Sequence, residues 1–118
     1  MPAEGRRIIR KADRTWGPYD LDGPLDETHG LIPLSYRRDL GEGTYLMRMD
    51  PGAVTVPHEH SGYEDFLMLE GELIDDDGTV IGPGDLVTYA PGSFHNSRTE
   101  TGCVILVCEW KKSGAASG

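Results

Sequence analysis

The stretch that decides the fold is Gly52-Ala53-Val54-Thr55-Val56-Pro57-His58-Glu59-His60-Ser61-Gly62-Tyr63-Glu64. In an extended strand alternate residues share one face, and the face that we expect to point inward carries Val54, Val56, His58 and His60. The two histidines lie two residues apart, which separates their Cα atoms by about 6.6 Å along a strand, so both rings can bind the same ion. The stretch therefore predicts half of a metal site at the end of an apolar strand.

A carboxylate follows at the next corner. Gly62 permits a sharp bend of the backbone, and Glu64 then opens a second apolar run. Alternation places its carboxylate on the same face as Phe66 and Met68. Two imidazoles and one carboxylate are thus predicted to converge where the chain turns from one strand into the next.

Composition favours a single all-β domain. The chain has 118 residues, enough for one hydrophobic core and too few for two. Sixteen glycines and eight prolines interrupt it at short intervals, and no window keeps a helical period. We expect an N-terminal arm and loop over 1–27, a barrel of short strands over 28–110, and a flexible tail over 111–118.

Charge and hydropathy exclude two classes of partner. The net charge is −9, from 20 acidic and 11 basic residues, and such a field repels nucleic acid and anionic lipid headgroups. No apolar run approaches the roughly 20 residues that cross a bilayer, and the N-terminus lacks the apolar core of a secretion signal. We expect no nucleic-acid partner, no membrane association and a cytoplasmic location.

Further elements follow from turn residues and alternation. We expect a loop over 16–33, in which a lone His29 is a surface residue, and a hairpin turn over 75–78. Strands are predicted over 44–49, 86–89 and 103–110. On the last strand Cys103 and Cys108 point to opposite faces about 16 Å apart, so we expect reduced, buried thiols and no disulfide.

The residues from Gly52 onward match the first cupin motif. The spacing is a glycine, five residues, His58, one residue, His60, three residues, Glu64, six residues and Gly71. The chain thereby resembles the cupin superfamily, which implies a double-stranded β-helix, or jelly-roll barrel. Four ligand types in register with structural glycines make a chance match improbable.

The residues from Gly84 resemble the second cupin motif. Gly92 allows a corner that re-aims the chain, and His95 follows it as the fourth expected metal ligand. Ala90 stands where the motif has a proline, and Thr99 stands where it ends in asparagine. Over 28–109 the amino-acid sequence is similar to the cupin domain of ChrR-like anti-sigma factors and to dioxygenases of the acetylacetone-cleaving type.

This ligand set implies one divalent metal ion per chain. Three neutral imidazoles and one carboxylate leave the ion with a charge near +1 and, in octahedral geometry, two adjacent open positions. A bidentate substrate, or a substrate oxygen together with dioxygen, fits such a site. We favour iron(II), because it passes charge to dioxygen, while zinc, manganese, nickel and copper accept the same ligands.

A substrate pocket is expected inside the barrel. Inward alternation predicts its lining as Tyr45, Met47, Met49, Val56, Phe66 and Met68. An apolar pocket around one metal suits a small aromatic or dicarbonyl molecule. The alternative is a core filled by these side chains with no cavity.

Three functions remain open from the sequence. The first is a mononuclear iron(II) dioxygenase acting on a small diketone, hydroxyketone or phenolic substrate, with Glu64 as a metal ligand or as a base. The second is a non-oxidative isomerase, cyclase or lyase that uses the ion as a Lewis acid. The third is a zinc-binding sensory module without catalysis, although residues 1–27 are too few for a separate sigma-binding domain.

We also expect a homodimer. The strand over 64–70 carries Leu67 and Leu69 on the face opposite the metal, and Val104 and Cys108 face the same way in the last strand. A sheet that is apolar on both faces needs a cover. Pairing of the N-terminal segments of two chains, which hold five basic residues around Ile8, is the expected form.

Overall fold

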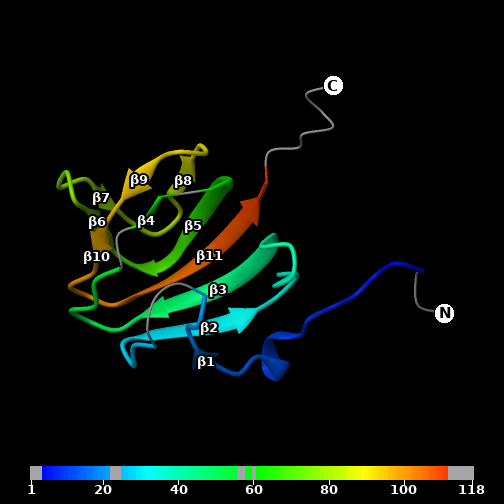
Figure 1. Cartoon of the computed structure of the whole chain (residues 1–118). Coiled ribbons are helices and arrows are strands. Elements are labelled where there is room, and N and C mark those ends of the chain that lie inside the picture. The colour runs from blue at the N-terminus through cyan, green and yellow to red at the C-terminus, as the bar shows by residue number, and fades with distance from the viewer. Residues whose placement is uncertain (1–3, 22–24, 56–57, 60, 112–118) are drawn as a thin grey trace.

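The computed structural model describes residues 4–21, 25–55, 58–59 and 61–111, with the backbone alone at 58 and 59. Short β-strands dominate it (Figure 1). In chain order the elements are the 3₁₀ helix η1 (Lys11–Asp13), β1 (Gly17–Pro18), β2 (His29–Pro33), β3 (Gly43–Met49), β4 (His58–Glu59), β5 (Tyr63–Gly71), β6 (Leu73–Asp75), β7 (Val80–Ile81), β8 (Leu86–Tyr89), β9 (Phe94–His95), β10 (Ser97–Arg98) and β11 (Cys103–Trp110). The all-β prediction is confirmed.

The strands form one large sheet and two small ones. The large sheet has the order β1-β2-β3-β11-β5-β8, so the last strand of the chain lies at its centre. The small sheets have the orders β10-β6-β7 and β4-β9, and all of these pairings are antiparallel. The chain passes repeatedly between the large sheet and the small ones, as in a jelly roll (Figure 1).

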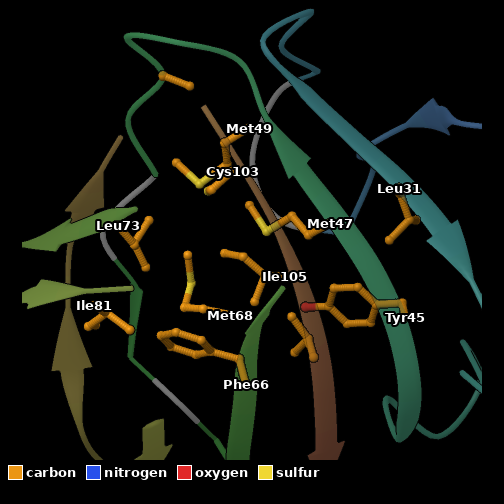
Figure 2. Close-up of a cluster of buried hydrophobic side chains, with 12 residues drawn as sticks. Leu31, Tyr45, Met47, Met49, Phe66, Met68, Leu73, Ile81, Cys103 and Ile105 are labelled. Carbon is orange, nitrogen blue, oxygen red and sulfur yellow. The ribbon is translucent and has the colours of Figure 1, made fainter. Parts of the chain in front are cut away.

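The hydrophobic core lies between these sheets. Side chains from β3, β5 and β11 meet those of β6 and β7 (Figure 2). The buried cluster consists of Leu31, Tyr45, Met47, Met49, Ala53, Phe66, Met68, Leu73, Ile81, Cys103, Ile105 and Val107. Burying this cluster is the main favourable term that holds the two layers together.

The stretch over 52–64 was expected to place Val54 in the interior, and the structure places it at the surface. Val54 is 50% exposed, and the neighbouring Thr55 lines the interior instead. Val54 forms a bridge with Arg98, whereas further along His58 pairs with His95. The register of these two pairs differs by one residue, and a shift of one residue reverses which side chains face inward. The expectation for Val54 is wrong for this reason.

The loop expected over 16–33 contains two paired strands. Gly17 of β1 lies opposite Leu31 of β2. The guanidinium of Arg48 packs against Gly30, 2.6 Å from the position that a Cβ atom would take there. That guanidinium also lies over the ring of Trp16, 5.4 Å from its centroid. Cross-strand packing thus orders a segment whose composition predicts irregular structure.

Gly71 ends β5 where no other residue fits. Its φ is 74°, and a Cβ atom would lie 1.9 Å from the backbone oxygen of Gly102. Two residues earlier, Leu69 is the extra residue of a bulge, because Val104 pairs with Glu70 while Ile105 pairs with Met68. The bulge bends β5 around the core.

The two cysteines are free, as predicted, but Cys108 is half-buried rather than buried. Cys103 is buried in the core, and burial raises the pKa of its thiol to about 11. The thiol therefore stays protonated at neutral pH. Within the described ranges, no helix has the length and hydrophobicity to cross a membrane.

Candidate metal centre and cavity

The candidate metal centre lies where β4 pairs with β9. His58 stands directly opposite His95 in this antiparallel pair. Residues that face each other in this way have Cα atoms about 4.5–5.5 Å apart. The backbone therefore brings together two predicted ligand positions that are far apart in the sequence (Figure 1). His60 and the side chain of His58 lie outside the described part of the chain.

Glu64, the predicted carboxylate ligand, lies near the start of β5. Its neighbours across the sheet are Tyr89 of β8 and Glu109 of β11. The side chain is half-buried and lines the same interior cavity as His95. The structure thus places two of the four predicted ligands on one cavity.

The hydrogen bonds of His95 determine which ring nitrogen carries its proton. His95 is 8% exposed, and its Nδ1 lies 3.2 Å from Oγ of Ser97. The single hydroxyl hydrogen of Ser97 is donated to Oδ1 of Asp75. Because Ser97 has no second hydrogen, Nδ1 of His95 must be the donor to Oγ. The lone pair of the neutral ring then lies on Nε2, which is the form of imidazole that binds a metal.

Tyr89 holds His95 from a second side. The two rings stack with centroids 4.1 Å apart and an interplanar angle of 12°. The Tyr89 hydroxyl donates to Oδ2 of Asp75 at 2.7 Å. Burial, and then this bond to a carboxylate, raise the pKa of Tyr89 well above its usual value, so the hydroxyl remains a donor. Asp75 therefore fixes both the proton and the plane of the His95 ring.

The donor set that is described fits a divalent metal ion. It comprises the imidazole of His95, with its lone pair on Nε2, and the carboxylate of Glu64 on the same cavity. Ser97 and Asp75 orient the imidazole through hydrogen bonds, as such groups commonly do for metal-binding histidines. Among the described side chains no three His, Cys, Asp or Glu residues form a complete metal site. The full set of His58, His60, Glu64 and His95 stays a prediction.

The interior holds a cavity of about 70 Å³. At roughly 10–15 Å³ for each water-sized sphere, it has room for five or so small groups. Figure 2 shows the apolar side chains of its wall pointing inward from both layers. The lining residues are Tyr19, Asp26, His29, Tyr45, Met47, Met49, Thr55, Glu64, Phe66, Leu73, His95, Ser97, Ile105 and Val107. The barrel is therefore not filled by its own core.

Four of the six predicted pocket residues lie on this wall, namely Tyr45, Met47, Met49 and Phe66. Met68 is buried at 1% exposure and packs within the core cluster (Figure 2). Val56 lies outside the described residues. Whether these side chains contact a ligand stays a prediction.

His29 is one of several cavity residues that the sequence did not predict. It is not at the surface, as expected, but 7% exposed on the cavity wall. It opens β2 and pairs with Met49 of β3. The available signal was alternation, because His29 shares a strand face with Leu31, which is 2% exposed. The loop-like composition around it obscured that signal.

Residues 5–113 match the family model of the ChrR cupin-like domain. The chain belongs to this cupin family. The match begins at residue 5, so it includes most of the arm and loop expected over 1–27. The resemblance inferred from the two motifs is confirmed. No curated protein sequence matches this cupin.

Solved structures with similar folds have varied activities. An RmlC-like cupin from Ralstonia eutropha JMP134 is 15% identical, with a TM-score of 0.74 over 87% of this chain and 68% of that chain. The polyketide cyclase RemF from Streptomyces resistomycificus is 19% identical, with a TM-score of 0.67 over 88% and 78%. A protein of Methylibium petroleiphilum PM1, whose activity as an acetylacetone dioxygenase is itself an inference, is 11% identical, with a TM-score of 0.70 over 91% and 78%. Such low identities show the fold alone.

Proposed function

We propose that this cupin is a mononuclear iron(II) dioxygenase that acts on a small diketone, hydroxyketone or phenolic substrate. The observation that carries the proposal is a single cavity lined by His95 and Glu64 on apolar walls, with the lone pair of His95 on Nε2. His58, His60, Glu64 and His95 are the residues proposed to hold the ion. Once bound, iron(II) supplies the capacity to pass charge to dioxygen.

The walls of the cavity account for the substrate class. Met47, Met49 and Phe66 offer apolar surface, and the space admits only a small molecule. Excluding water strengthens the electrostatic interaction between an enolate or phenolate oxygen and a cation. A small molecule with two oxygens and a short apolar body matches both features. Glu64 either completes the ligand set or accepts a proton from the bound molecule.

Oxygen uptake tests this proposal. Protein reconstituted with iron(II) under nitrogen and then exposed to air is expected to consume dioxygen together with pentane-2,4-dione, a hydroxyketone or a phenol. A rate of about 1 s⁻¹ or faster is typical of enzymes. The same protein loaded with zinc is the matched control and should consume none. Absence of uptake with every substrate of the panel contradicts the oxidative proposal.

Two alternatives give different results in this experiment. Turnover that persists without oxygen and with zinc or nickel indicates an isomerase, cyclase or lyase, and the structural likeness to a polyketide cyclase makes this the second candidate. No turnover with any metal, together with recovery of a sigma factor in a pull-down, indicates a sensory module.

We further propose that this cupin forms a homodimer. On the outer face of the large sheet an apolar row crosses five strands in register: Ile32, Leu46, Leu106, Leu67 and Leu86. Ile32 and Leu46 are already buried within the chain, Leu106 and Leu67 are half-buried, and Leu86 is 64% exposed. The partly uncovered end of the row, from Leu106 to Leu86, favours a partner surface. Light scattering should give twice the mass of one chain, and Leu106→Glu should give one chain. A single-chain mass for the unmodified protein contradicts the proposal.

A further inference from the structure

His29 has a hydrogen-bonded arrangement of its own at the cavity wall. Its Nδ1 lies 3.1 Å from Oγ1 of Thr28 and 3.5 Å from Oδ2 of Asp26. The hydroxyl of Thr28 donates to Oδ1 of Asp26 at 2.6 Å. Since that hydroxyl has only one hydrogen, Nδ1 of His29 must donate to Oγ1. The lone pair of the neutral ring then lies on Nε2.

This arrangement repeats the one around His95. In both cases a histidine Nδ1 donates to a hydroxyl, which in turn donates to an aspartate: Thr28 and Asp26 serve His29, as Ser97 and Asp75 serve His95. Both histidines line the same cavity. They come from different layers, His29 from the large sheet and His95 from a small one. One cavity therefore carries two imidazoles with their proton on Nδ1.

The carboxylate behind His29 is ionised. Hydrogen bonds from the Thr28 side chain and backbone hold the pKa of Asp26 below its usual value. Its Oδ2 lies 3.5 Å from Nδ1 of His29, on the side of the ring opposite to Nε2. The bonds of His29 are to Thr28 and Asp26, and none of these is a predicted metal ligand. His29 is thus placed to gain a proton without leaving the metal centre short of a ligand.

We propose that His29 is the general base for the molecule that occupies the cavity. Its Nε2 takes a proton from the carbon between two carbonyl groups, or from an acidic hydroxyl. The C–H or O–H bond breaks, its electron pair stays on the ligand as an enolate or phenolate, and the new N–H bond makes the ring an imidazolium facing Asp26. This inference uses the ligand class of the proposed function but requires neither metal nor oxygen.

A buried histidine is often purely structural, and the two roles predict different behaviour. A structural ring leaves a bound diketone in its neutral form. A base produces an ion pair within the cavity, and the enolate absorbs at a longer wavelength than the neutral enol. Difference spectroscopy of the bound ligand therefore separates the two roles.

The experiment uses the full chain after removal of metal by a chelator, with pentane-2,4-dione added to saturation at neutral pH. The unmodified protein is expected to show the enolate band. His29→Gln and Asp26→Asn should each reduce its amplitude by about tenfold, because the first removes the nitrogen that takes the proton and the second removes the carboxylate that orients the ring through Thr28. Asp77→Asn, which makes the same charge change in the exposed turn after β6, is the control and should keep the band.

Three results overturn the proposal: no enolate band in the unmodified protein, an undiminished band in His29→Gln, or equal losses in Asp26→Asn and Asp77→Asn. Circular dichroism checks that each variant is folded, and Asp26→Asn, at a half-exposed site, covers the case in which His29→Gln does not fold. The metal content of the untreated protein is measured separately. A chain that binds no metal yet forms the enolate refutes the proposed function and retains this inference.

Discussion

Replacing His95 with glutamine is expected to reduce bound metal from about one ion per chain to less than a tenth of that. The ring is buried beside Ser97, and its Nε2 carries the lone pair. Glutamine preserves much of the volume but removes the nitrogen ligand, and loss of one ligand from a set of four sharply weakens binding. Elemental analysis of protein purified from cells without added metal measures the effect directly.

Two further variants make this result specific. Ser97→Ala leaves the ring in place but removes the acceptor of its Nδ1 hydrogen, so metal affinity should fall by about 10–100-fold. His29→Gln changes a histidine on the same cavity that is not a predicted ligand, and the metal content should stay unchanged. Full metal content in His95→Gln, with the protein folded, contradicts the proposed centre.

Replacing Gly71 with alanine is expected to destabilise the protein by about 3 kcal/mol or more. The φ of 74° is unfavourable for any residue with a Cβ atom, and that atom would collide with the backbone oxygen of Gly102 at 1.9 Å. The collision can be relieved only if the end of β5 moves away from the start of β11, and these two strands are neighbours in the large sheet. Thermal unfolding followed by circular dichroism should show a Tm lower by roughly 12 °C, or no folded protein.

Gly78→Ala is the matched control for this prediction. Gly78 has a φ of 88°, but nothing lies within 4 Å of the position of an added Cβ atom. The substitution therefore includes the conformational cost without the collision, about 1–2 kcal/mol. Equal losses of stability in the two variants would show that the contact with Gly102 does not matter.

The sequence identified most strands where turn residues bound an alternating run. The last strand was predicted over 103–110, and β11 has these bounds. The hairpin turn over 75–78 joins β6 to β7. The spacing of His58, His60, Glu64 and Gly71 indicated the cupin family, which the family model confirms. These successes have one basis, because each depends on residues close together in the chain.

Two of the predictions that were wrong concern residues whose position depends on pairing between distant segments. Val54 was expected inside, but its bridge to Arg98 and the later pairing of β4 with β9 differ by one residue in register. His29 was expected outside, but pairing with Met49 turns it inward. In each case the facing strand, rather than the local pattern, decides which side of the sheet a residue occupies.

The amino-acid sequence by itself determined the all-β class, the family and the residues offered as ligands, because glycine spacing and alternation are local properties of a chain. Only the tertiary structure decided that His29 shares a cavity with His95 and that both rings carry their proton on Nδ1. The physical reason is that a ring's proton position depends on its hydrogen-bond partners. For His95 the carboxylate that orders the ring comes from Asp75, twenty residues earlier in the chain, and the fold alone brings it there.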